Sequence, residues 1–325
     1  MSGQSDTLLE ASHVKKYFPV RSRIPFSSAK AWVHAVDDVS FTVRAGETLS
    51  LVGESGCGKT TTAKMTLMME APTAGSMRFR GQELSSLTGQ RLRDYRGAVQ
   101  AVFQDPWSSL NPRMRTARFI GEPLAVNTAL SRPEIDERVR SLLVSVGLDP
   151  ASAANFPHEF SGGQRQRVAV ARALALDPQV VVLDEPVSAL DVSIGAQIMN
   201  MLRDIQASRG ISYLLIAHNL ATVRYLSDRV AVMYLGRIVE EADSEELFRN
   251  PQHPYTKALI SAALTIRPGE KTDEIILSGE LPSAVKLPPG CRFHTRCPFA
   301  FKKCFVEEPQ YREIAPGHRA ACHLH

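Results

Sequence analysis

The chain has 325 residues, of which 44% are hydrophobic and 22% charged. This balance is typical of a soluble globular protein of about two domains, and it excludes a disordered chain, a collagen-like repeat or a coiled coil as the main architecture. The 38 basic and 34 acidic residues are well mixed, so the net charge of +4 argues for neither nucleic acid nor lipid as a partner. No segment has the ~18 uninterrupted apolar residues of a membrane-spanning helix, and the N-terminus lacks the layout of a secretion signal, so we expect a cytosolic protein.

The first half of the chain predicts strands followed by helices. Residues 7–52 are rich in β-formers and end in the apolar run 48–52, which has the length of a buried strand. A helix is expected from about 60 to 69, another strand at 99–103, and mainly helices over 113–160.

Strands and helices alternate in the second half. Residues 180–183 predict a buried strand, 194–205 a helix with one apolar face, 211–217 the next strand, and 228–236 a terminal hairpin. This alternation predicts an α/β core with a largely parallel sheet. After about residue 265 the composition turns to Pro, Gly and Cys, which indicates a small appended domain.

A phosphate-binding motif, G-x-x-x-x-G-K-[ST], lies directly after the apolar run 48–52 and before a predicted helix. Glycines allow a tight turn whose backbone N–H groups point at phosphate oxygens, and the helix adds the positive end of its dipole. Lys59 would neutralise the β and γ phosphates, and the Thr60 hydroxyl would hold Mg²⁺. Cys57 is expected to fill space rather than to react. The predicted nucleotide-binding set is Gly53, Glu54, Ser55, Gly56, Cys57, Gly58, Lys59, Thr60 and Thr61.

Two acidic residues follow the buried strand 180–183. Asp184 stands at its end, where a carboxylate can hold Mg²⁺ through its water shell. Glu185 is then placed to polarise a water for in-line attack on the γ-phosphate. Alone, this pattern also fits a strand that reaches solvent; together with the phosphate-binding motif it indicates a catalytic pair.

Four further segments identify a family. Ser161-Gly162-Gly163-Gln164 resembles the signature sequence of the ATP-binding-cassette (ABC) ATPases, and Ser188-Ala189-Leu190-Asp191 resembles their D-loop. Gln104 resembles their Q-loop glutamine, and His218 their switch histidine. The order and spacing agree with the family from about residue 7 to 250.

The resemblance implies the fold and its division. We expect an α/β P-loop NTPase of the ABC type, with a mixed sheet core, a helical subdomain at about 105–175 and an antiparallel β subdomain. The nucleotide-binding domain would span 1–265. A small Cys-rich C-terminal domain of the oligopeptide-transporter type would span 266–325.

The resemblance also implies roles in binding and hydrolysing ATP. Gln104 would contact Mg²⁺ or the attacking water, and His218 would bind the γ-phosphate and hold Glu185 and the water in line. The signature residues of one cassette would bind the ATP held by a second cassette, so that two ATP molecules are sandwiched in a head-to-tail pair. The residues expected to meet nucleotide in this way are Ser161, Gly162, Gly163, Gln164 and Asp191.

Two positions refine these expectations. Tyr17 and Phe18 both resemble the aromatic residue that stacks on adenine, and the K-x-aromatic spacing favours Phe18. Asn219 follows His218 where Asp is more usual, and we expect little effect on catalysis because this residue is not placed at the phosphate.

Longer segments at 103–112, 250–259 and 277–283 resemble the ATP-binding subunits of dipeptide/oligopeptide permeases. The resemblance implies an importer that works at the cytoplasmic face of the membrane. Its partners would be two transmembrane permease subunits, a second ATP-binding subunit that is either a copy or a homologue, and an extracytoplasmic substrate-binding protein. The same machinery could import nickel chelates, sugars or opines. A soluble ABC ATPase acting on DNA or ribosomes is the weaker alternative, because the chain has neither a coiled-coil insertion nor a second cassette.

The segment from Gln104 to Met114 carries two apolar residues, Trp107 and Leu110, that a lone cassette would expose. We expect them to line a groove for a short cytoplasmic helix of the permease. The alternative is that both are core residues.

Four of the five cysteines lie in the last 35 residues, with the spacing C-x₅-C-x₆-C-x₁₇-C. In a cytosolic chain such clustering favours a metal or cluster site over disulfides. The spacing fits neither common zinc nor common ferredoxin patterns. The resemblance to permease ATPases favours a structural [4Fe–4S] cluster, with zinc second and four reduced thiols as the remaining alternative. The expected ligands are Cys291, Cys297, Cys304 and Cys322, with His294, His318 and His323 as substitutes.

Overall fold

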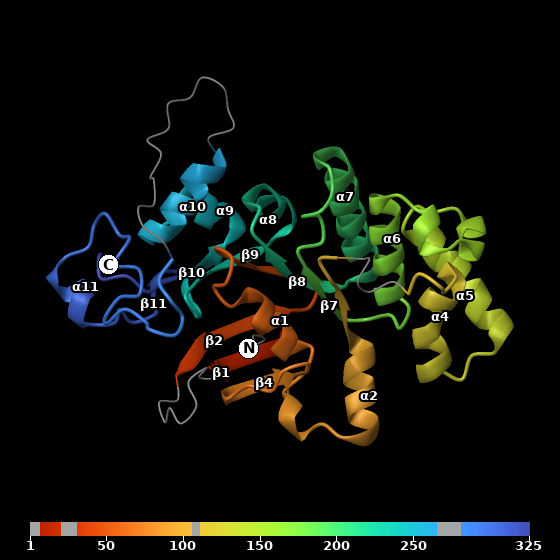
Figure 1. Ribbon diagram of the computed structural model, residues 1–325, viewed down its shortest axis with the longest axis horizontal. Coiled ribbons are helices and arrows are strands. Elements are labelled where there is room, and N and C mark those ends of the chain that lie inside the picture. Colours follow the sequence, from red (N-terminus) through yellow and green to blue (C-terminus); the bar gives the residue numbers. More distant parts are fainter. Residues whose placement is uncertain (1–6, 21–30, 106–110, 265–280) are drawn as a thin grey trace. The chain divides into compact units, whose positions relative to one another are not determined.

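The computed structural model describes residues 7–20, 31–105, 111–264 and 281–325. The chain divides into two compact units, each assembled from segments far apart in the sequence (Figure 1). The first unit comprises Met1–Leu8, Val43–Thr48 and Ser86–Leu215. The second comprises Leu9–Thr42, Leu49–Ser85 and Ile216–His325, so it contains both the phosphate-binding motif and the cysteine-rich tail.

The first unit combines parallel strands with a group of helices. Its main elements are α2 (Gly89–Ala98), β6 (Val99–Val102), α4 (Thr116–Asn127), α5 (Arg132–Ser145), α6 (Gly162–Ala173), β7 (Val180–Asp184), α7 (Val192–Arg209) and β8 (Ser212–Ala217). Strands β6 and β7 pair in parallel, with Val99 opposite Val180. Helices α4, α5 and α6 pack against one another, as Figure 1 shows. Short 3₁₀ turns at Pro150–Ala154 and Pro157–Glu159 complete the largely helical stretch predicted for 113–160.

Local sequence explains where these elements begin and end. Helix α5 starts directly after Ser131, whose backbone N–H and hydroxyl both donate to Oε2 of Glu134, at 2.7 and 2.6 Å. Helix α7 ends at Gly210, whose φ of 66° is the left-handed conformation of a helix C-terminus. Strand β7 is buried up to its last residue, which places Asp184 where the strand leaves the core.

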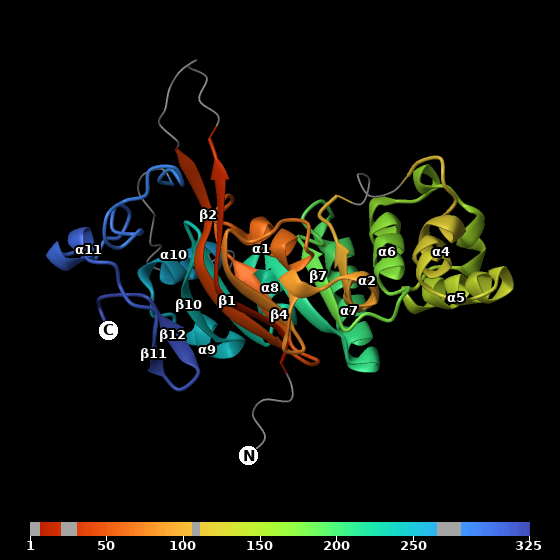
Figure 2. The ribbon, with the colours of Figure 1, turned by 90° about the horizontal axis from the view of Figure 1, so that it is seen from below.

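The second unit contains two groups of strands. Its elements are β1 (Thr7–Pro19), β2 (Trp32–Arg44), β3 (Thr48–Val52), α1 (Lys59–Thr66), β4 (Ala74–Phe79), β5 (Gln82–Glu83), α8 (Leu220–Leu226), β9 (Arg229–Tyr234), β10 (Arg237–Asp243), α9 (Ser244–Arg249), α10 (Pro254–Leu264), α11 (Lys302–Val306), β11 (Arg312–Ala315) and β12 (His318–Ala320). One group has the order β2-β1-β4-β5, in which β1 and β4, and β4 and β5, are antiparallel (Figure 2).

The other strand group of this unit is mixed. Its order is β11-β12-β10-β9-β3, and β3 and β9 are parallel whereas the remaining pairs are antiparallel. The predicted hairpin at 228–236 is therefore present as β9 and β10. It is not terminal as expected, because β12 pairs with β10 through Glu240 opposite Ala320. The tail thus extends the sheet of the second unit.

The sequence predictions miss several elements. Helix α2 and strand β4 were not expected, and the tail contains α11, β11 and β12 where little periodicity was seen. Within the described residues, no helix is long and apolar enough to cross a membrane.

Candidate nucleotide-binding site

The phosphate-binding loop connects β3 to α1 in the second unit, as the motif predicts. Two of its glycines are required both because a Cβ atom would clash and because the backbone has a positive φ. Gly53 has a φ of 151°, and a Cβ atom there would lie 2.2 Å from the backbone oxygen of Met233. Gly58 has a φ of 111°, and its Cβ would lie 2.3 Å from the backbone oxygen of Ala35. Any side chain at either position would push the loop off the strands beneath it.

The Lys59 side chain binds the backbone of its own loop. Its side chain is buried, and Nζ donates to the backbone oxygens of Gly53 at 2.7 Å and Glu54 at 3.0 Å. The neighbouring Cys57 is fully buried, and burial raises the pKa of its thiol. A buried, protonated thiol is a poor nucleophile, which agrees with the expected space-filling role.

The outer side of the loop faces solvent. Ser55, Gly56 and Thr60 are exposed, and Thr61 is half-buried in the first turn of α1. No side chain caps this helix N-terminus, so its N–H groups can bind an anion. The loop therefore has a cationic side chain, helix N–H groups and a hydroxyl on one short segment, which is the donor set of a phosphate site.

The first unit holds the predicted acidic pair. Asp184 and Glu185 are half-buried at the end of β7, and Glu185 has a φ of 49°, a left-handed conformation unusual for a residue other than glycine. Gln104, which follows β6, donates from Nε2 to Oε2 of Glu185 at 2.8 Å. The structure thus brings together two of the three predicted catalytic residues.

The third predicted catalytic residue, His218, is exposed directly after β8 and belongs to the second unit. Asn219 begins the following helix, α8, and its side chain accepts from the backbone N–H of Ala221 at 2.9 Å. Asn and Asp cap helices about equally well, so this departure from the family pattern preserves the helix start.

The signature segment begins helix α6. Ser161 is exposed and forms a capping box with Gln164, in which the Gln164 side chain accepts from the Ser161 backbone N–H at 2.9 Å. A Cβ at Gly163 would lie 2.4 Å from Cγ2 of Ile194 in α7, so this glycine lets the two helices approach. Asp191 is exposed immediately before α7. Gly162 lies in the first turn of α6.

Tyr17 and Phe18, the two candidates for stacking on adenine, lie near the end of strand β1 and make different contacts. The Tyr17 hydroxyl donates to Asp37, and its ring lies 4.4 Å from that of His34. Burial, together with the bond to Asp37, raises the pKa of Tyr17 to about 12. Phe18 is half-buried, with Nζ of Lys16 at 4.9 Å from its ring centre. Tyr17 is therefore fixed by a polar partner that the sequence did not reveal.

The cysteine-rich tail does not form the expected metal site in this structure. Among the residues it describes, no group of three or more His, Cys, Asp or Glu is placed to hold a metal ion. Burial raises the pKa of Cys291 to about 11, and the thiols of Cys297, Cys304 and Cys322 act in the same direction. Burial thus favours the protonated form of the Cys291 thiol. The structure therefore gives no support to the predicted [4Fe–4S] cluster or zinc ion.

The histidines named as substitute ligands have other partners. His294 contacts the backbone oxygen of Cys291, His318 pairs with Glu240 at 2.7 Å, and His323 contacts the backbone oxygen of Glu307. The proposed permease groove at Trp107 and Leu110 lies outside the described residues.

Comparison with known proteins agrees with this geometry. The family model described as "ABC transporter" matches residues 36–188, and the one described as "Oligopeptide/dipeptide transporter, C-terminal region" matches residues 239–304. The oligopeptide transport ATP-binding protein AppF of Bacillus subtilis is 48% identical, over 100% of this chain and 99% of its own. The chain belongs to the ATP-binding subunits of the dipeptide/oligopeptide ABC transporters. As such, it is an ATP hydrolase coupled to transport.

Other relatives support the same assignment. The dipeptide transport ATP-binding protein DppF of Escherichia coli is 45% identical, over 99% of this chain and 97% of its own. Among solved structures, cbiO1 of Clostridium perfringens, part of the ABC transporter complex cbiONQ, superposes with a TM-score of 0.65 at 26% identity. That likeness covers 75% of this chain and 92% of cbiO1. The ATP-binding cassette MJ0796, dimeric and bound to ADP and Pi, superposes with a TM-score of 0.64 at 26% identity, over 73% of this chain and 99% of its own.

Proposed function

We propose that this chain is the ATPase subunit of an importer for dipeptides or oligopeptides. The observation that carries the proposal is full-length similarity at 45–48% identity to proteins named for oligopeptide and dipeptide transport, joined to an intact phosphate-binding loop. The reaction is ATP + H₂O → ADP + phosphate, and the energy drives a conformational cycle in the permease.

Each predicted site residue has a separate role in binding or hydrolysing ATP. Backbone N–H groups of the loop and Lys59 hold the β and γ phosphates, and Lys59 exchanges its contacts with Gly53 and Glu54 for phosphate oxygens. Glu185 polarises the attacking water, and Gln104 fixes the carboxylate by its hydrogen bond. His218 binds the γ-phosphate and holds Glu185 and the attacking water in line.

The donor set also suits Mg²⁺. The Thr60 hydroxyl and the Gln104 amide would offer oxygen atoms, which this ion prefers, and the Asp184 carboxylate would hold the ion through its water shell. When bound, Mg²⁺ neutralises charge that develops on the phosphates. Phe18, with Tyr17 as the alternative, stacks on the adenine ring.

The ATPase acts in a pair. Residues of the signature segment are exposed at the start of α6, where they can meet the nucleotide of a second cassette. The similarity to the dimeric cassette MJ0796 supports such a pair. The second cassette is a copy of this chain or a homologue, and the two bind two permease subunits at the cytoplasmic face of the membrane. A separate extracytoplasmic protein delivers the substrate.

Substrate uptake tests the proposal. Cells that lack this chain should lose ATP-dependent uptake of labelled di- and oligopeptides, and the restored chain should recover it, whereas a Lys59→Ala chain should not. Unchanged peptide uptake together with lost uptake of nickel chelates, sugars or opines would assign a different cargo to the same machinery.

A [4Fe–4S] cluster in the tail, with zinc as the alternative, remains part of the proposal. It is supported by the sequence, in which Cys291, Cys297, Cys304 and Cys322 fall within 32 residues of one another. Since no described group is placed to hold a metal ion, the cysteines would have to move together on binding. About four irons per chain in anaerobically purified protein would support the cluster, and one zinc the alternative. Absence of both metals would leave four reduced thiols.

A further inference from the structure

We propose that the cysteine-rich tail positions the phosphate-binding loop through Arg296, a residue to which neither motif nor family comparison gives a role. The proposal rests on the proposed ATPase function and adds a positioning residue to it. Arg296 lies directly before Cys297, and its partner Glu54 is the second residue of the loop.

The contact is a two-pronged ion pair. Nη1 of Arg296 donates to Oε2 of Glu54 at 2.8 Å, and Nη2 donates to Oε1 at 3.1 Å. The arginine side chain is 8% exposed and the glutamate side chain 28%, so water screens the pair only in part. The hydrogen bonds to Glu54 raise the pKa of Arg296 above its already high value, which keeps the guanidinium charged. Paired N–H groups of this kind fix the direction of a carboxylate as well as its position.

A second group holds the same loop residue. The Tyr255 hydroxyl, from helix α10, accepts a hydrogen bond from the backbone N–H of Glu54 at 2.8 Å. Glu54 is thereby held at its N–H by Tyr255, at its backbone oxygen by Lys59 and at its carboxylate by Arg296. Two of these three groups belong to the segment after residue 250, far from the loop in the sequence.

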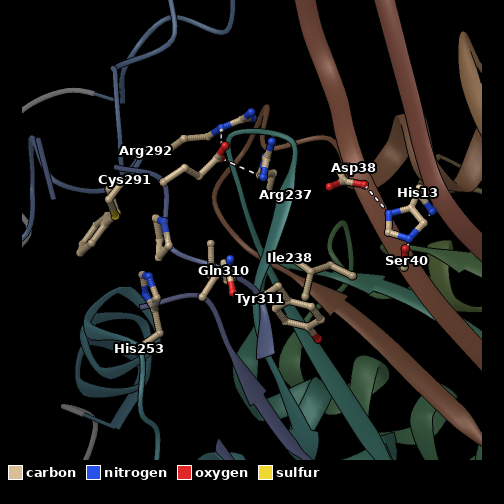
Figure 3. Close-up of a pocket in the computed structure, with 15 residues that line it drawn as sticks. His13, Asp38, Ser40, Arg237, Ile238, His253, Cys291, Arg292, Gln310 and Tyr311 are labelled. Atoms are coloured by element: carbon tan, nitrogen blue, oxygen red, sulfur yellow. Dashed lines mark hydrogen bonds and ion pairs between the residues drawn. The ribbon is translucent and has the colours of Figure 1, made fainter. Parts of the chain in front are cut away.

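The tail segment that carries Arg296 is itself firmly packed. Phe293 is fully buried, with its ring 5.5 Å from that of Tyr255 and 5.2 Å from that of Tyr234. Arg292, one residue earlier, donates to Asp37 and to the backbone oxygen of Leu235 at 2.6 Å. Figure 3 shows Arg292 beside Cys291 in the wall of a cavity of about 460 Å³. These anchors, three and four residues before Arg296 in the chain, give it a fixed base from which to hold the loop.

The bonds that Arg296 and Tyr255 form with Glu54 matter most when nucleotide binds. Without nucleotide, Lys59 stabilises the loop by its bonds to Gly53 and Glu54. Once its ammonium group turns to the phosphates, those two bonds are lost. Arg296 and Tyr255 still hold Glu54, so the loop keeps the shape that points its N–H groups at the phosphates. Loss of Arg296 should therefore weaken ATP binding and leave the chemical step, which Glu185 performs, nearly unchanged.

Steady-state kinetics of the full chain, assembled with its permease, test this role. We expect Arg296→Met to raise KM for ATP about 10-fold with kcat changed less than about 2-fold, since a hydrogen-bonded charge pair contributes on that scale. Arg296→Lys, which keeps the charge and loses the paired geometry, should recover part of the loss. Glu54→Gln should raise KM similarly, and the double variant should be no worse than either single variant.

Two controls separate positioning from folding. Lys303→Met removes an exposed ion pair with Glu307 in the same tail and should leave KM unchanged. Glu54→Gln breaks the contact from the loop side without altering the tail, so it remains informative if Arg296→Met lowers the unfolding temperature. Unchanged KM in both Arg296→Met and Glu54→Gln, or a fall in kcat alone, would overturn the proposal. A wild-type chain without ATPase activity would instead overturn the proposed function.

Discussion

Glu185 combines an unusual backbone with a directed side chain. Its φ of 49° lies in the left-handed region, which costs a residue other than glycine about 1–2 kcal/mol. The following turn compensates, because the backbone oxygen of Glu185 accepts from the Ser188 hydroxyl at 3.1 Å and from the Ser188 N–H at 3.3 Å. Gln104 then fixes the carboxylate by a hydrogen bond from its Nε2 to Oε2 of Glu185 at 2.8 Å. A strained backbone and a fixed carboxylate thus occur at the residue that we propose as the general base.

Glu185→Gln tests this assignment at the level of one residue. The amide keeps the size of the side chain and removes the base, so ATP hydrolysis should fall about 10²–10⁴-fold, the usual contribution of a positioned general base. ATP binding, measured by titration with a fluorescent analogue, should change little. Glu122→Gln, an exposed carboxylate of α4 paired with Arg172, is the matched control. Near-normal turnover in the Glu185 variant would remove this residue from the role.

At the level of elements, the tail is fastened to the sheet by a buried ion pair. His318 of β12 contacts Glu240 of β10 at 2.7 Å, and both side chains are almost completely buried. Backbone N–H groups of Gln252 and His253 donate to the same carboxylate. The bond to Glu240 raises the pKa of His318, with a further contribution from Glu246. Burial alone would raise the pKa of Glu240, but the bonds from His318 and the neighbouring groups outweigh it and lower the pKa.

Because the pKa of His318 is raised in the folded chain, the contribution of this residue to stability depends on pH. A histidine whose pKa is raised on folding stabilises the fold below its unfolded pKa of about 6.5, and the effect disappears as the pH rises through the folded value. Replacing His318 by Gln should therefore lower the free energy of unfolding by about 1.5–3 kcal/mol at pH 6. The difference between variant and wild type should shrink at pH 9. Denaturant titrations at both pH values measure it.

A matched histidine controls this experiment. His323 lies in the same tail, where it contacts the backbone oxygen of Glu307 and its ring lies 6.3 Å from that of Phe301, so His323→Gln should show no comparable change with pH. A loss of stability in His318→Gln that is equal at pH 6 and pH 9 would contradict the protonated ion pair.

At the level of the whole molecule, the exposed signature segment predicts ATP-dependent association. With Glu185→Gln preventing turnover, addition of ATP should convert monomers to dimers, which light scattering can follow. Adding Ser161→Arg should abolish the dimer, because a large cation at the start of α6 would occlude the face that meets the second nucleotide. Dimers that persist in this double variant would place the contact elsewhere.

Much of the fold was predictable because its signals are local. The loop from Gly53 to Thr60 carries strand, turn and helix in one continuous segment, and β7 is an uninterrupted apolar run. Helix α2 escaped prediction because its sequence, GQRLRDYRGA, has few apolar residues and buries only Tyr95. Strands β11 and β12 escaped because they are short and because β10, with which β12 pairs, lies about 80 residues earlier, as Glu240 opposite Ala320 illustrates.

In the candidate site, too, the residues of contiguous motifs could be predicted from the sequence, whereas long-range contacts could not. The loop lysine and the acidic pair follow from contiguous motifs, and the signature serine follows from the family resemblance of a contiguous motif. The groups that hold those residues do not follow from spacing. Tyr255, Arg292 and Arg296 act on partners more than 200 residues away, and nothing in the local pattern of the tail distinguishes these side chains from ordinary surface residues.

The separation of 242 residues between Glu54 and Arg296 has a consequence for synthesis of the chain. At about 5–20 residues per second, the ribosome adds Arg296 roughly 12–48 s after Glu54. Throughout that interval the nascent loop has its own lysine but lacks the arginine and the β12 strand that complete its unit. Under the role proposed for Arg296, a chain truncated before this residue by a premature stop codon should bind ATP more weakly than the full chain. The order of synthesis thus places the loop lysine in the chain well before the arginine that we propose holds the loop.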